Sequence, residues 1–78
     1  MPTLKRYGGL QGSSGVRAYA LLPGAIVVEF VNGAVYLYTD ASAGPGCIAK
    51  MHRLAAQGRG LSTLISRVVR NRFEQRLR

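Results

Sequence analysis

The sequence is short of the residue types that many functional sites require. Its 78 residues include one cysteine, one histidine, three acidic residues and no tryptophan. A single cysteine excludes an intramolecular disulfide and is typical of a reducing compartment, so we expect a cytoplasmic protein. One cysteine and one histidine are too few for a structural zinc site, which takes four ligands. The composition therefore predicts neither a metal site nor a cofactor.

Catalytic groups are equally scarce. Cys47, His52 and Asp40 are the candidates for a nucleophile, a base and an orienting group, but their spacing matches no known catalytic signature. We interpret Cys47 as a small buried hydrophobe near a helix start and His52 as a residue of a polar helix face. The sequence thus predicts a protein that is not an enzyme.

Long hydrophobic runs are also missing, which predicts that no segment spans a membrane. The first residues, MPTLKRYGGLQGSSG, are typical of neither a secretory signal nor a membrane anchor. Since 47% of the residues are hydrophobic, a packed core is expected, and the length suits one domain. The glycines and serines of GGLQGSSG indicate a flexible lead-in over residues 1–13, followed by a single domain over residues 14–78.

Positive charge is what the sequence has in excess. Lys and Arg number 11 against three acidic residues, for a formal charge of +8, and nine of the 11 are arginine. The planar guanidinium group suits phosphate and stacks on bases. The C-terminal stretch RVVRNRFEQRLR alone holds five arginines and one glutamate. Nucleic acid is therefore the first class of partner to consider.

Hydrophobic periodicity predicts a small α+β domain, in which a three-stranded antiparallel meander is covered on one face by two helices. The turn residues Asn32-Gly33 indicate a two-residue type I′ hairpin turn. One helix is expected within residues 41–57 and a second from Ser62 to about Arg76. The predicted strands are Val16 to Leu21, Ala25 to Val31 and Ala34 to Thr39.

A two-residue turn would fix the register of the hairpin, with Glu29 opposite Tyr36 and Val28 opposite Leu37. This register gives the sheet a core face and a mixed face. The core face would carry Ile26, Val28, Phe30, Val35 and Leu37. The mixed face would carry Val27, Glu29, Val31, Tyr36 and Tyr38, together with Arg17 and Tyr19 from the first strand.

Three features favour nucleic-acid binding, and each also has a structural explanation. Tyr36 and Tyr38 could stack on bases, although tyrosine is favoured on half-buried strands without any ligand. The cations of the second helix could bind phosphates, or they could form a solvated face in which Arg70 pairs with Glu74. Gly58-Arg59-Gly60 could cradle a phosphate, but a plain interhelical turn explains it as well. The candidate phosphate-binding arginines are Arg59, Arg67, Arg70, Arg72 and Arg76, and Arg17 on the tyrosine face is a further candidate for nucleic-acid binding.

The hairpin VVEFVNGAVYLY, with its Tyr36-Leu37-Tyr38, and the glycine-led helix start GRGLSTLI resemble the KTSC domain. This short module is named for its occurrence at the C-terminus of some lysyl-tRNA synthetases, and it also occurs as a small stand-alone bacterial protein. The likeness covers about residues 13 to 67. The resemblance implies a short antiparallel sheet with helices, and it favours RNA as the partner.

The sequence therefore predicts a non-catalytic RNA-binding module, whose ligand would be a single-stranded RNA or a tRNA. The alternative is a protein-interaction or oligomerisation module that uses the tyrosine face and an open sheet edge. A third hypothesis is a basic amphipathic helix that binds an anionic membrane surface. It is weaker because the apolar stripe of that helix is needed for the core.

Overall fold

The computed structural model describes residues 3–7, 15–69 and 72–78 of the chain. Within them, five strands form one open sheet in which all neighbours run antiparallel. The strands are β1 (Lys5–Arg6), β2 (Val16–Leu22), β3 (Ala25–Phe30), β4 (Val35–Thr39) and β5 (Gln75–Arg76). The helices are α1 (Asp40–Ala43), α2 (Pro45–Gln57) and α3 (Leu61–Leu64), the last continued by a π-helical turn, η1 (Ile65–Val69). The α+β class is confirmed.

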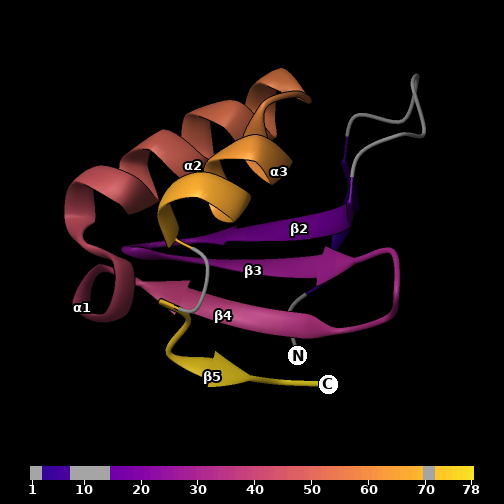
Figure 1. Ribbon diagram of the computed structural model, residues 1–78, viewed down its shortest axis with the longest axis horizontal. Helices are drawn as coiled ribbons and strands as arrows, with labels where there is room; N and C mark the ends of the chain where they lie inside the picture. Colours follow the sequence, from indigo (N-terminus) through magenta and orange to yellow (C-terminus); the bar gives the residue numbers. More distant parts are fainter. Residues whose placement is uncertain (1–2, 8–14, 70–71) are drawn as a thin grey trace.

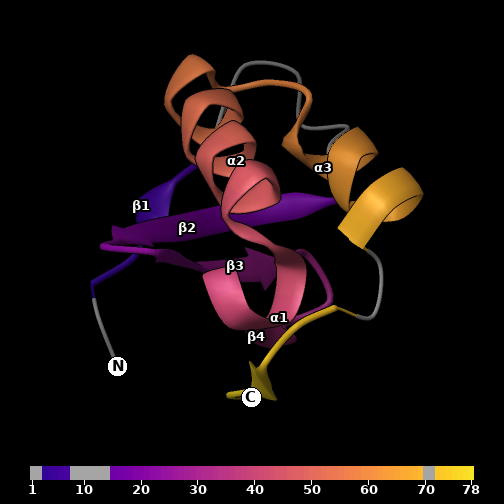
Figure 2. The ribbon, with the colours of Figure 1, turned by 90° about the vertical axis from the view of Figure 1, so that its left-hand side faces the viewer.

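The elements form two layers, with α2 and α3 together on one side of the sheet (Figures 1 and 2). The predicted meander is the centre of the sheet, formed by β2, β3 and β4. Strands from opposite ends of the chain extend it, β1 beside β2 and β5 beside β4. The prediction of three strands was therefore too low, because short edge strands have too few residues to show a periodic pattern.

The hairpin between β3 and β4 has a three-residue loop and not the predicted two-residue turn. The N–H of Gly33 donates to the carbonyl of Phe30 at 2.9 Å, and the N–H of Phe30 donates to the carbonyl of Ala34 at 2.8 Å. Gly33 has a φ of 93°, a conformation that favours glycine. The loop thus resembles the common type in which a turn is followed by a residue with positive φ.

This loop shifts the register of the hairpin by one residue, which moves every side chain of a strand to the other face. Val28 lies opposite Tyr36 and not opposite Leu37. The predicted faces are therefore wrong for β4. Tyr36 and Tyr38 pack into the cluster beneath the helices, whereas Val35 and Leu37 belong to the opposite face.

Two apolar clusters, one on each face of the sheet, form the core. The helix-side cluster contains the largest buried side chains, and it includes Tyr7, Tyr19, Ile26, Val28, Tyr38, Ile48, Met51, Leu61 and Ile65. A smaller group, here called the outer cluster, consists of buried Ala20, Val27 and Val35 under half-buried Leu4, Leu22, Leu37 and Leu77. Fully burying one large aliphatic side chain contributes about 1.5–3 kcal/mol, so both faces stabilise the fold.

A capping box starts the helical segment directly after β4. The hydroxyl of Thr39 accepts from the N–H of Ser42 at 3.1 Å, and the hydroxyl of Ser42 accepts from the N–H of Thr39 at 3.0 Å. These bonds satisfy backbone donors that a helix start leaves unpaired. The chain turns at Gly44, and Pro45 begins α2, which ends at Gln57 with Gly58 as its C-cap. The predicted helix within residues 41–57 is therefore two helices, one of them short.

The predicted second helix is wrong for residues 72–76. After η1, residues 70–71 lie outside the described part of the chain, and residues 72–78 form an extended segment. In it, β5 pairs with β4, so that Arg76 lies opposite Tyr36 and Gln75 lies opposite Leu37. The edge of β4 offers unpaired backbone groups, and these bonds replace the helical ones.

Apolar contacts on both faces explain why the tail is extended. Phe73 packs on the helix-side cluster with its ring centroid 4.6 Å from that of Tyr36, while Leu77 joins the outer cluster. Glu74, considered above as a partner of Arg70, accepts a hydrogen bond of 2.6 Å from the hydroxyl of Thr39. Arg70 itself lies outside the described residues. An exposed helix would bury neither apolar side chain.

Residues 3–7, expected in a flexible lead-in, are part of the fold. β1 pairs with β2, and the Tyr7 side chain is only 4% exposed. Its ring meets that of Tyr19 edge to face at 6.2 Å between centroids. The lead-in prediction is therefore wrong for this segment, and its remaining residues, 1–2 and 8–13, lie outside the described ones.

Candidate nucleic-acid interface

The two tyrosines expected to stack on bases point under the helices and away from solvent. Tyr38 is 1% exposed, and Phe73 meets it edge to face. Tyr36 is half-buried between Phe30 and Phe73, with centroid distances of 5.6 and 4.6 Å. Burial, with a smaller charge effect from Tyr36, raises the pKa of the Tyr38 hydroxyl to about 12. Base stacking needs an open ring face, which the buried ring of Tyr38 lacks, while Phe30 and Phe73 cover part of the Tyr36 ring.

The arginines predicted to bind RNA are spread over several elements. Arg17 is the extra residue of a β-bulge in β2 and donates from Nη2 to a backbone carbonyl of the hairpin loop at 3.0 Å. Arg76 lies on β5, with Cζ 5.6 Å from the centroid of the Tyr36 ring. Arg72 is exposed before β5, and Arg70 lies outside the described residues. No single helix brings these four together.

Arg59 and Arg67 belong to a different group, on what we call the helical layer, residues 45–69. This segment contains no Asp or Glu, and its cations are all exposed. Lys50 and Arg53, three residues apart on α2, share one side of that helix. The sequence prediction missed these two because it gave weight to the denser arginine run that follows. The complete lack of acidic residues over the segment is the signal that would have found them.

The three carboxylates of the chain lie outside the helical layer. Glu29 pairs with Arg78 at 3.5 Å, Glu74 accepts from Thr39, and Asp40 begins α1. Within the residues that the structure describes, Arg78–Glu29 is the only ion pair. The four cations of the helical layer therefore have no carboxylate partner there, and their charge remains available to a ligand.

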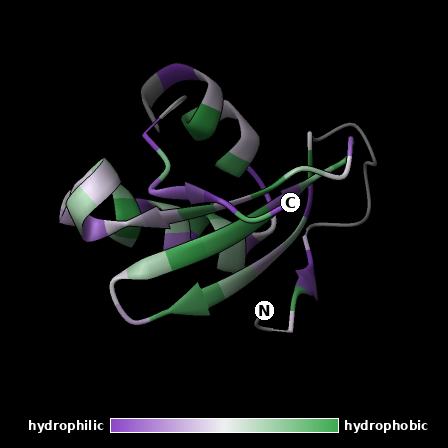
Figure 3. Ribbon diagram, turned by 90° about the horizontal axis from the view of Figure 1, so that it is seen from below, coloured by the Kyte–Doolittle hydropathy of each residue, from purple (hydrophilic) through white to green (hydrophobic). Residues whose placement is uncertain are grey.

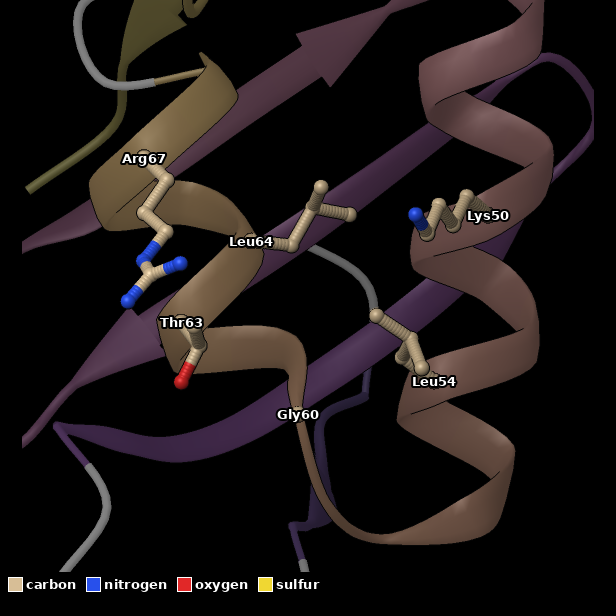
Figure 4. Close-up of a pocket in the computed structure, with 6 residues that line it drawn as sticks. All are labelled: Lys50, Leu54, Gly60, Thr63, Leu64 and Arg67. Carbon is tan, nitrogen blue, oxygen red and sulfur yellow. The ribbon is translucent and has the colours of Figure 1, made fainter.

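A groove of about 380 Å³ lies between α2 and the segment formed by α3 and η1. In Figure 4, Leu64 points from α3 towards α2, and Lys50 points from α2 towards it. Arg67 extends on the side of Thr63. The groove combines an apolar lining with a cation on each wall, and its residues are Lys50, Leu54, Gly60, Thr63, Leu64 and Arg67.

The turn Gly58-Arg59-Gly60 uses its neighbouring N–H groups within the fold. The N–H of Gly58 donates to the carbonyl of Leu54 at 3.0 Å, and the N–H of Leu61 donates to the hydroxyl of Tyr7 at 3.0 Å. Gly60 has a φ of 87°, and a Cβ there would lie 3.4 Å from Leu54 Cδ2. The segment is an interhelical turn, and these donors are not free to hold a phosphate.

The residues considered for catalysis do not form a cluster. His52 Nε2 lies 2.6 Å from the carbonyl oxygen of Ala25, a hydrogen bond that ties α2 to β3. Cys47 is half-buried against the helix-side cluster. Across residues 3–7, 15–69 and 72–78, no three His, Cys, Asp or Glu side chains are grouped so that they could hold a metal ion.

In the described part of the chain, no helix has the length and apolar character needed to cross a bilayer. Comparison with protein-family models, with curated proteins and with solved structures gives no match. The function is therefore inferred from the residues themselves, above all from the helical layer and its groove.

Proposed function

We propose that this protein is a non-catalytic module that binds single-stranded RNA through the helical layer. The distribution of charge carries the proposal: the layer exposes Lys50, Arg53, Arg59 and Arg67 and contains no carboxylate. Cations without an internal partner can neutralise phosphates and release condensed counterions, which is the main source of affinity for a polyanion. Three of the four are arginines, whose planar donors match phosphate geometry.

Neighbouring cations reinforce one another when they lie within a Debye length, which is about 8 Å at physiological ionic strength. Lys50 and Arg53, three residues apart on α2, meet this condition. These two cations therefore act on a ligand together and not as isolated charges. The formal charge of +8 would also speed the encounter with a polyanion.

The resemblance to KTSC domains supports RNA as the polyanion, and we propose membership of that family. In this chain the tyrosines of Tyr36-Leu37-Tyr38 pack in the helix-side cluster, and the leucine packs in the outer cluster. Packing thus accounts for the motif without a ligand. If the chain binds RNA, recognition rests on the helical layer and not on the tyrosines.

The test compares two double variants of equal net charge. Arg53→Gln with Arg59→Gln removes cations from the helical layer, and Arg72→Gln with Arg76→Gln removes the same charge from the C-terminal segment. Binding of a fluorescent single-stranded oligoribonucleotide is followed by anisotropy over a series of salt concentrations. Losing two phosphate contacts makes the slope of log affinity against log salt shallower by about 1.4.

We expect this change for the helical-layer variant only. Equal losses in both variants would mean that net charge, and not the helical layer, determines binding. If the parent protein does not bind RNA at low salt, the proposed function is wrong. Duplex RNA and single-stranded DNA of the same length, used as competitors, measure the preference for an unpaired strand and for ribose.

Self-association through the outer face of the sheet is a second candidate. Of the interaction surface expected from the sequence, the tyrosines lie under the helices, while the edges of the open sheet are the short strands β1 and β5. The outer cluster, however, has no helix over it in Figures 1 and 2. Figure 3, seen from below, shows that the central strands are largely hydrophobic, whereas the short edge strands are hydrophilic. Apolar surface of this kind is typical of protein contacts.

Sedimentation equilibrium of Leu37→Lys and Val31→Lys tests this second candidate. Leu37 belongs to the outer cluster, whereas Val31 is 54% exposed in the hairpin loop, so the two variants add the same charge in different places. If the outer face forms a dimer, only Leu37→Lys abolishes it. A parent protein that stays monomeric at all concentrations rules this function out.

A further inference from the structure

The groove between α2 and α3 has an apolar lining, which contacts to phosphates alone would not need. Its lining is mainly apolar, from Leu54 and Leu64, and a cation stands on each wall, Lys50 on α2 and Arg67 on η1 (Figure 4). We propose that the groove receives one unpaired base of the bound RNA, with the flanking phosphates on Lys50 and Arg67. This inference rests on the proposed RNA-binding function and assigns the part of the surface that selects unpaired strands.

The size of the groove limits what can occupy it. Its volume of about 380 Å³ lies near the lower end of the range of about 300–1,000 Å³ that is usual for small-molecule sites. A protein helix lying in a groove covers several turns, which is far more than this space offers. One nucleotide-sized group is a better match.

The lining provides what an unpaired base needs. Leu54 is half-buried and Leu64 is 7% exposed, so the floor is apolar and held in place by the core. The flat face of a base gains dispersion contacts on such a surface. The exposed hydroxyl of Thr63 can donate to or accept from a base edge. Gly60 also lines the groove and adds no side chain to it.

The charges favour a nucleotide over other amphipathic anions. The phosphates on the two sides of a base within a strand would meet the cations on the two walls. A fatty acid carries one charge and would leave a cation unmatched, while Arg53 and Arg59 continue the positive surface along α2 and its turn. A duplex keeps its bases stacked inside, so it can reach the cations but cannot fill the groove.

Thr63→Trp tests the inference, because it fills the groove without changing the charge. Ser66→Trp is the matched control, since Ser66 is also exposed and does not line the groove. Any base stacking on the added indole is measured by this control. We expect Thr63→Trp to lower the affinity for a single-stranded oligoribonucleotide about ten-fold, within the usual effect of losing one base contact. Its affinity for duplex RNA stays within about two-fold of the parent.

Unchanged binding of single strands by Thr63→Trp overturns the inference but leaves the proposed function standing, provided that the parent binds RNA with a normal salt dependence. Absence of binding by the parent overturns both. A second test is a titration of the protein with adenosine 5′-monophosphate, in which the methyl resonances of Leu54 and Leu64 report binding in the groove. Saturable shifts are expected, and shifts caused by decanoate instead would assign the groove to an acyl chain.

Discussion

The hydroxyl of Tyr7 accepts a hydrogen bond of 3.0 Å from the backbone N–H of Leu61, 54 residues further along the chain. The N-cap residue of α3 is a glycine without a capping side chain, so a first-turn donor would otherwise lack a partner. A tyrosine from the N-terminal segment thus does what a serine or aspartate does in most helices. It also fixes one wall of the groove, because Thr63 and Leu64 lie on α3.

Tyr7→Phe tests this contact. The variant keeps the buried ring but leaves the N–H of Leu61 without an acceptor, so we expect a loss of about 1–3 kcal/mol in the free energy of unfolding. Tyr19→Phe is the control, since no described residue hydrogen-bonds to the hydroxyl of Tyr19. Urea denaturation of both variants measures the difference. Equal effects would show that the hydrogen bond contributes nothing to stability.

The second prediction concerns the faces of the hairpin. Tyr38 is 1% exposed and Phe30 is half-buried at the rim. Tyr38→Ala should therefore cost about 3–5 kcal/mol, as for other large aromatic side chains in cores, and Phe30→Ala should cost less. Chemical denaturation gives both values. The opposite order would support the two-residue turn and an exposed tyrosine face.

Alkaline pH should destabilise the fold through Tyr38. Its pKa is raised from 10.0 in the unfolded chain to about 12 in the fold, so between these values only the folded state keeps the proton. The contribution of Tyr38 to the free energy of unfolding is fully present below pH 10. It is lost as the pH rises towards 12, which lowers the free energy of unfolding by about 2–3 kcal/mol. Denaturation of the parent and of Tyr38→Phe at several alkaline pH values measures this. A Tyr38→Phe variant that loses stability just as steeply would contradict the assignment.

Amide hydrogen exchange distinguishes the extended tail from a helix. The N–H of Glu74 donates to the carbonyl of Leu37 at 2.7 Å, and the N–H of Leu77 donates to that of Val35 at the same distance. We expect slow exchange at these two amides. Phe73→Ala, which removes the apolar anchor of the tail, should speed exchange at both without affecting β3. Continuous protection over residues 72–76 would indicate a helix instead.

The sequence predicted the central strands because their alternation is a local signal, and it failed where a distant partner decided the structure. In the hairpin, the sequence is compatible with two different loop lengths. Both a two-residue and a three-residue loop place Gly33 at a positive φ, so the turn residues do not distinguish them. The apolar pattern did not help either, since Val35 and Leu37 suit a core face as well as Tyr36 and Tyr38 do. The deciding contacts come from the helices and from Phe73.

The prediction of a helix in the C-terminal segment failed for a related reason. The apolar stripe of α3 runs on into η1, and the sequence beyond it has no glycine or proline to mark an end. Its extended form depends on pairing with β4, a contact between residues far apart in the chain. For the candidate site, Arg59 and Arg67 were found from charge alone. The groove was not, because it depends on how two helices lie relative to each other.

The pairing of β4 with β5 also has a consequence for synthesis on the ribosome. The contact from Thr39 to Glu74 spans 35 residues, which take about 2–7 s to translate at about 5–20 residues per second. Until β5 has been made and pairs, this edge of β4 lacks its partner. An unpaired strand edge is a template for aggregation. Slow formation of this pairing would therefore lengthen the period in which the β4 edge is open to other chains.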